Sequence, residues 1–71
     1  MADRFDLELT FADKRELTFS LISTNGAHAY DEGEDFLRWY RRRNPERKIV
    51  KAQVVRLREQ GVQIIPIEVD E

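Results

Sequence analysis

Two consecutive stretches of the chain alternate apolar and polar residues with a period of two, which is the pattern of a strand with one buried face. The apolar positions of the first stretch are Phe5, Leu7, Leu9 and Phe11, and those of the second are Leu17, Phe19 and Leu21. For both sets to share one face, Phe11 has to lie opposite Leu17 across an odd-numbered loop. The sequence therefore predicts a β-hairpin that brings these two stretches together.

The dipeptide Asn25-Gly26 follows the second stretch. Asn-Gly favours a tight hairpin turn because both residues tolerate positive φ. This turn predicts a short third strand over about residues 27–30, with Ser23 facing His28 across the hairpin.

Asp31 and Glu34 then have the spacing of a capping box, which predicts a helix that begins near residue 32. At about 100° per residue, Phe36, Leu37 and Tyr40 point to the core with Trp39 at their flank. Three arginines point the opposite way: Arg38, Arg41 and Arg42.

The segment of residues 46–60 fits two structures. Asn44-Pro45 before it and Gly61 after it resemble the start and stop signals of a second helix. Its β-branched residues favour a strand, but a strand would mix apolar and polar residues on one face, namely Ile49, Val55 and Leu57 with Lys51 and Gln53. We prefer the helix and keep the strand as the alternative. The pattern of residues 62–69 predicts a final strand. Pro66 has no N–H group, so this strand lacks one of its backbone hydrogen-bond donors.

These elements predict one α+β domain that spans residues 1–71. It has two layers, an antiparallel sheet of a β-hairpin plus a returning strand, covered on one face by one or two helices. A chain of 71 residues has room for a single small core. No internal repeat or linker divides it.

Charge is segregated along the chain although the net charge is only −2. Residues 1–37 hold three basic and nine acidic residues, for a net of −6, and residues 38–58 hold nine basic residues and one acidic residue, for a net of +8. The remaining residues add four acids. A partner responds to this local field rather than to the total, so the middle third is the candidate functional region.

The amino-acid composition excludes several classes of protein. The chain has no Cys, which excludes disulfide scaffolds and thiolate zinc sites and suits the reducing cytoplasm. The N-terminus has no apolar signal region, and no window is apolar enough to span a membrane. We therefore expect a soluble cytoplasmic protein.

The residues that carry chemistry do not assemble into a predicted active site. A Ser23–His28 pair lacks an orienting acid and an oxyanion hole, so we interpret it as a polar cross-strand pair. The acidic run 31–35 lacks the ligand spacing of a calcium loop and is explained by helix capping. We expect no catalytic residue, no metal and no cofactor.

The basic segment predicts a macromolecular binding surface. Arg outnumbers Lys by seven to two in residues 38–58, and Arg suits carboxylates, phosphates and aromatic faces. The candidate partner-binding residues are Arg38, Trp39, Arg41, Arg42, Arg43, Arg47, Lys48, Lys51 and Arg58. We place Trp39 at the edge of the core and keep an exposed anchor as the alternative.

These features predict a non-enzymatic binding module, of adaptor or inhibitor type, whose first candidate partner is an acidic protein. DNA or RNA, contacted through phosphates, is the alternative, although the acidic ends of the chain would repel a polyanion. We expect a monomer at micromolar concentration, because exposed ion pairs alone hold copies together weakly.

Overall fold

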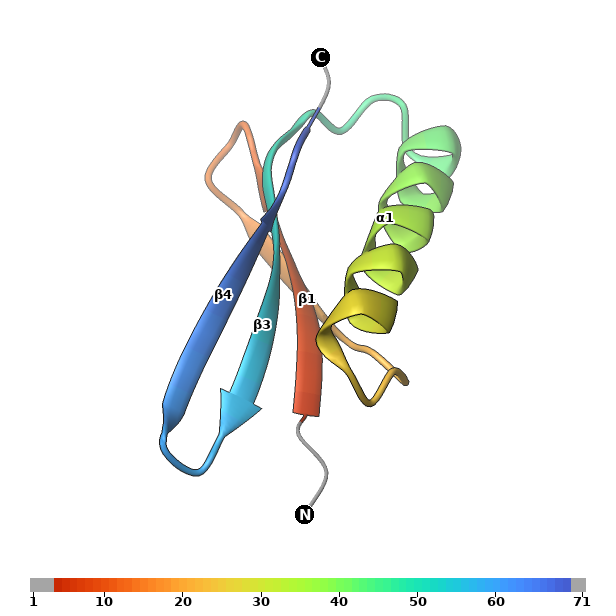
Figure 1. Cartoon of the computed structure of the whole chain (residues 1–71). Helices are drawn as coiled ribbons and strands as arrows, with labels where there is room; N and C mark the ends of the chain where they lie inside the picture. The colour runs from red at the N-terminus through yellow and green to blue at the C-terminus, as the bar shows by residue number, and fades with distance from the viewer. Residues whose placement is uncertain (1–3, 70–71) are drawn as a thin grey trace.

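The computed structural model describes residues 4–69 and folds as two layers (Figure 1). In chain order, its elements are strands β1 (Arg4–Phe11) and β2 (Glu16–Ser20), helix α1 (Gly26–Arg43), and strands β3 (Ile49–Arg58) and β4 (Gly61–Ile67). The strands form one antiparallel sheet in the order β2-β1-β3-β4. Helix α1 covers one face of this sheet, which confirms the predicted α+β architecture with its single-helix version.

The core lies between α1 and the two central strands. On β1 the four predicted apolar residues are all buried, and Phe5, Leu7 and Leu9 are fully so. They meet Leu37 and Tyr40 of the helix. Directly opposed residues of neighbouring antiparallel strands share a face, so the register also defines the other side of the sheet, which we call the open face.

Gly33 is a point of close contact between α1 and the sheet. A Cβ atom at this position would lie 3.1 Å from Val54 Cγ2, 3.1 Å from Ile67 Cδ1 and 3.4 Å from Leu7 Cδ1. These three atoms belong to β3, β4 and β1. The absence of a side chain at Gly33 therefore allows the two layers to approach closely at this point.

The predicted hairpin of β1 and β2 forms, but its register differs from the prediction. Leu17 pairs with Leu9 and not with Phe11. The turn is shorter than expected, since the Phe11 N–H donates to the Arg15 carbonyl at 2.9 Å and Lys14 takes a positive φ of 72°. The difference is two residues, which keeps every side chain on its predicted face.

The predicted third strand over residues 27–30 is wrong, and so is the helix start near residue 32. Asn25 is instead the N-cap of α1, with its side chain accepting a hydrogen bond from the His28 N–H at 3.0 Å. Asn is favoured both at a helix N-cap and in a tight turn, so the local pattern did not distinguish these outcomes. Asp31, the predicted cap, lies inside the helix.

The preferred second helix over residues 46–60 is also wrong, because this segment forms β3 between β1 and β4. Its mixed face exists: Lys51, Gln53, Val55 and Leu57 share the open face, opposite Thr10, Glu8, Asp6 and Arg4. A shift in register between Thr10 and Phe11 turns Ile49 back toward the core, where it is buried. The bulge thus removes Ile49 from the mixed face, while Val55 and Leu57 stay on it.

Gly61 begins β4 and does not end a helix. Its φ of 137° lies in a region that residues with a side chain rarely adopt. Glu59 and Gln60 connect Arg58 to Gly61, which are paired. The final strand predicted at residues 62–69 is confirmed as β4, which ends at Ile67.

Candidate binding surface at the carboxyl end of the helix

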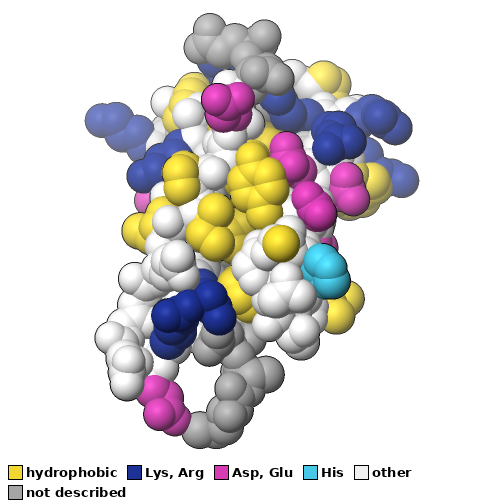
Figure 2. Space-filling model, viewed as in Figure 1, with side chains coloured by type: hydrophobic (Ala, Val, Ile, Leu, Met, Phe, Trp, Pro, Cys, Tyr) yellow, Lys and Arg dark blue, Asp and Glu magenta, His cyan; other side chains and the backbone are white. Residues whose placement is uncertain are grey.

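Seven of the nine candidate partner-binding residues gather where α1 ends and the loop to β3 begins. We call this group the basic end, and its members are Arg38, Trp39, Arg41, Arg42, Arg43, Arg47 and Lys48. Lys and Arg side chains are visible around this end of the helix at the upper right of Figure 2. Lys51 lies on the open face of the sheet, and Arg58 lies at the far end of β3. The continuous surface expected from two helices is therefore wrong, because β3 carries these two residues away from the helix.

The helix end gives a structural reason for some of these basic residues. Arg41, Arg42 and Arg43 occupy the last turn of α1, where cations are favoured by the negative end of the helix dipole. Asn44 closes the helix, since its backbone N–H donates to the Tyr40 carbonyl at 2.9 Å. Its side-chain amide donates to the same carbonyl at 3.2 Å. The arginines therefore project from a helix end that is closed by hydrogen bonds rather than frayed.

Arg47 is held in place from two sides. Its guanidinium donates to the Tyr40 hydroxyl at 2.7 Å and lies 4.0 Å above the ring of Phe11. A hydrogen bond and a cation–π contact fix most of the freedom of a long side chain, so less entropy is lost when a ligand binds.

Two shallow hollows flank Arg47 and Lys48. The larger, of about 390 Å³, is also lined by Arg41, Asn44, Pro45 and Ile49. The smaller, of about 220 Å³, is lined by Phe11 and Ala12 and by the carboxylates of Asp13 and Glu46. The surface therefore offers a cationic hollow beside one of mixed charge.

Trp39 stands at the border of the core and the surface. It is 49% exposed, and its ring lies 5.4 Å from that of Phe36, whose ring is 4.3 Å from Phe19 of β2. The guanidinium of Arg43 lies 4.9 Å from the centre of the Trp39 ring. Both predicted positions are thus partly true, since one side of the ring contacts the aromatic cluster while about half the residue faces solvent.

Arg38 makes an exposed ion pair with Asp35 at 3.6 Å, one helical turn earlier. Such pairs contribute about 0–1 kcal/mol and break easily. Arg38 is therefore accessible to a competing carboxylate.

Ser23 and His28 do not face each other. The Ser23 hydroxyl donates to Glu32 at 2.6 Å, and His28 Nδ1 lies 3.2 Å from the side-chain nitrogen of Asn25. The predicted pair is wrong because residues 26–30 are helical.

Glu32 fastens the loop between β2 and α1. Its carboxylate accepts the N–H groups of Ile22 at 3.1 Å and of Ser23 at 3.0 Å, in addition to the Ser23 hydroxyl. Partial burial opposes the charged form, but these hydrogen bonds outweigh it and hold the pKa of Glu32 below its ordinary value of 4.5. Sequence reasoning missed this clamp, because it assigned Glu32 to helix capping.

Within residues 4–69, no three His, Asp or Glu side chains lie close enough together to hold a metal ion. The same part of the chain contains no helix that is both long and apolar enough to cross a membrane.

Comparisons with protein-family models, with characterised proteins and with solved structures found no significant match.

Proposed function

We propose that this protein is a non-enzymatic, cytoplasmic binding module that docks an acidic protein partner through the basic end. The observation that carries the proposal is the position of Arg47, which two contacts hold in place and which lines one hollow together with Arg41 and Lys48. Preorganised guanidinium groups bind carboxylates bidentately at a low entropic cost.

Trp39 and Arg43 provide the second element of the proposed interface. Trp and Arg are the residue types that contribute most to protein–protein affinity when they are desolvated. Here a half-exposed Trp39 is covered by the Arg43 guanidinium on the same helix. A partner that displaces water from this pair gains apolar burial, while Arg38 and Arg42 steer its approach.

A protein is favoured over a nucleic acid by the mixed charge of the neighbouring hollow. Asp13 and Glu46 line it together with Arg47 and Lys48. The Asp13 carboxylate forms an exposed ion pair with Arg15 at 3.5 Å, so Glu46 is the main source of repulsion for a phosphate backbone. A protein surface can instead match both signs of charge.

The proposed function is tested by fluorescence anisotropy with two labelled probes, a Glu- and Leu-rich acidic peptide and a mixed-sequence oligonucleotide as DNA and as RNA. We expect salt-sensitive binding of the peptide that is tighter than binding of either oligonucleotide. The neutralising variant Arg38→Gln/Arg41→Gln/Arg42→Gln is expected to weaken peptide binding at least tenfold. Neutral Gln is chosen because reversed charges in the last turn would oppose the helix dipole.

The matched control is Lys51→Gln/Arg58→Gln, which removes positive charge from the two candidate residues outside the basic end. This control is expected to bind the peptide as the unchanged protein does. Losses of binding free energy in proportion to the charges removed, three in the test variant and two in the control, would mean that only total charge matters. Tighter binding of the oligonucleotide, with affinity that falls steeply with salt, would assign the surface to nucleic acid instead.

A further inference from the structure

The end of the β3–β4 hairpin has its apolar side facing away from the helix. All residues from 58 to 64 are exposed, and in Figure 1 the turn of this hairpin lies below the first turn of α1. An isolated two-stranded hairpin is marginally stable in water. This part of the sheet therefore lacks the cover that α1 gives to the rest.

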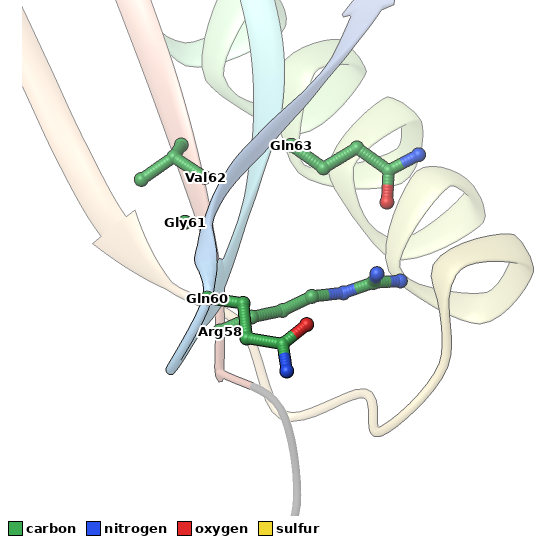
Figure 3. Close-up of a pocket in the computed structure, with 5 residues that line it drawn as sticks. All are labelled: Arg58, Gln60, Gly61, Val62 and Gln63. Atoms are coloured by element: carbon green, nitrogen blue, oxygen red, sulfur yellow. The ribbon is translucent and has the colours of Figure 1, made fainter.

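The two faces of this hairpin end have opposite character. Four apolar residues, which we call the distal strip, share the open face: Val55, Leu57, Val62 and Ile64. An open hollow of about 420 Å³ at the hairpin end is lined by the polar residues Arg58, Gln60 and Gln63 and also by Gly61 and Val62. Figure 3 shows the side chains of Arg58 and Gln63 pointing toward the helix side, and that of Val62 pointing away. Elsewhere in the sheet the apolar face is the one toward α1, so the pattern is inverted here.

Strand β4 is also an edge of the sheet. Edge strands are normally shielded by charges, by short length or by proline. Among these devices, β4 carries only Pro66. Gly61–Ile67 spans seven residues without a charged side chain, whereas β2, the other edge, has five residues and begins with Glu16. Val62 is 61% exposed and Ile64 is 56% exposed.

Pro66 indicates which backbone groups face the free edge. Proline cannot donate to the ladder, so its nitrogen suits a position directed away from β3. In an antiparallel pair this direction alternates, which gives Val62 and Ile64 the same orientation as Pro66. Their N–H and C=O groups are then available to another strand.

We propose that β4 pairs antiparallel with β4 of a second copy of this chain, about a two-fold axis at Ile64. In this register Ile64 lies against Ile64 of the second copy, and the Val62 N–H donates to the carbonyl of Pro66 in the second copy. The lack of charge in β4 is what selects a second copy, because identical strands meet without like-charge repulsion and place apolar residues against apolar residues.

The resulting dimer has one continuous sheet of eight strands with both helices on the same face. The two basic ends then lie at opposite ends of the sheet, so the dimer presents the proposed binding surface twice. This inference does not depend on what the basic end binds. It adds self-association at higher concentration to the expectation of a monomer, which considered only exposed ion pairs.

The experiment is sedimentation equilibrium of the full chain from about 5 to about 500 µM. Pairing along one strand buries less than the roughly 1,600 Å² of a standard interface, so we expect a dimer with a dissociation constant of tens to hundreds of micromolar. Ile64→Lys is expected to raise this constant at least tenfold. The control Ile22→Lys changes an apolar residue that is 89% exposed in the loop before α1, and it is expected to dimerise normally.

Hydrogen exchange distinguishes strand pairing from stacking of the open faces. Pairing predicts that the amides of Val62 and Ile64 exchange more slowly as the protein concentration rises, in a protein whose circular dichroism is unchanged. A monomer at 500 µM, unchanged dimerisation of Ile64→Lys, or a dimer without protection of these amides would each overturn the proposal.

Discussion

Replacing Gly33 with Ala tests how closely the helix packs on the sheet. In an open helix, a Gly-to-Ala change stabilises by about 1 kcal/mol, because Ala restricts the unfolded chain and favours the helix. At Gly33 the new methyl group would lie 3.1 Å from both Val54 Cγ2 and Ile67 Cδ1. Ile67 ends in a flexible side chain, but Val54 is fully buried and β-branched, so it has little freedom to move.

Overpacking of a core typically costs about 1–3 kcal/mol, which exceeds the gain in helix propensity. We therefore expect Gly33→Ala to lower the free energy of unfolding by about 0–2 kcal/mol. Gly33→Val adds two further methyl groups at the same point and is expected to cost about 3 kcal/mol or more. That loss is comparable to the roughly 3–5 kcal/mol that a domain of this size has in total.

The assay is urea unfolding followed by circular dichroism and by the fluorescence of Trp39. The matched control is Gly26→Ala at the first position of the helix, where a Cβ would lie an ordinary 3.8 Å from Ile65 Cδ1. This control is expected to be neutral or stabilising by a few tenths of a kcal/mol. If Gly33→Ala stabilised the protein by about 1 kcal/mol, the close contact between the layers would be refuted.

Three other substitutions test the two hairpin turns and the contact that holds the loop before α1. Glu32→Gln should destabilise the protein near pH 7, and the difference should shrink in thermal unfolding as the pH falls. The sign follows because a lowered carboxyl pKa gives stability that is present above the unfolded value, near 4.5, and lost as the pH falls through the folded value. Gly61→Ala should cost about 1 kcal/mol or more in urea unfolding, since an alanine is strained at φ 137° although nothing crowds its Cβ. Lys14→Gly should stabilise by about 0.5–1 kcal/mol in the same assay, because Lys14 has a φ of 72° that glycine adopts without strain; an unchanged midpoint would contradict this reasoning.

Part of the candidate site could be predicted from the sequence. The basic segment and its Trp39 were found by charge and spacing, and seven of its nine candidate residues do gather at one end of α1. The support of Arg47 by Phe11 was not readable, since the two residues are far apart in the chain and meet only through the pairing of β1 with β3. The distal strip was missed for the same reason, because it exists only when β3 and β4 lie side by side.

The sequence by itself determined the elements whose patterns have a single interpretation. Alternation with period two defined β1 and β2, a short apolar run defined β4, and the apolar spacing of Phe36, Leu37 and Tyr40 defined the buried side of α1. These patterns arise because one face of each strand or helix is buried. The spacing of apolar residues within the element is enough to show which face that is.

Only the tertiary structure decided the start of α1 and the nature of residues 49–58. Asn25-Gly26 suits a hairpin turn or a helix N-cap, and the apolar residues of the later segment fit a helix or a bulged strand. The local free energies of these alternatives are similar, because capping and turn preferences differ by about 1 kcal/mol or less. The choice is made by long-range pairing: β3 fills the place between β1 and β4, where Gln53 donates to Glu8 at 2.7 Å across the open face and Val54 is fully buried beneath Gly33.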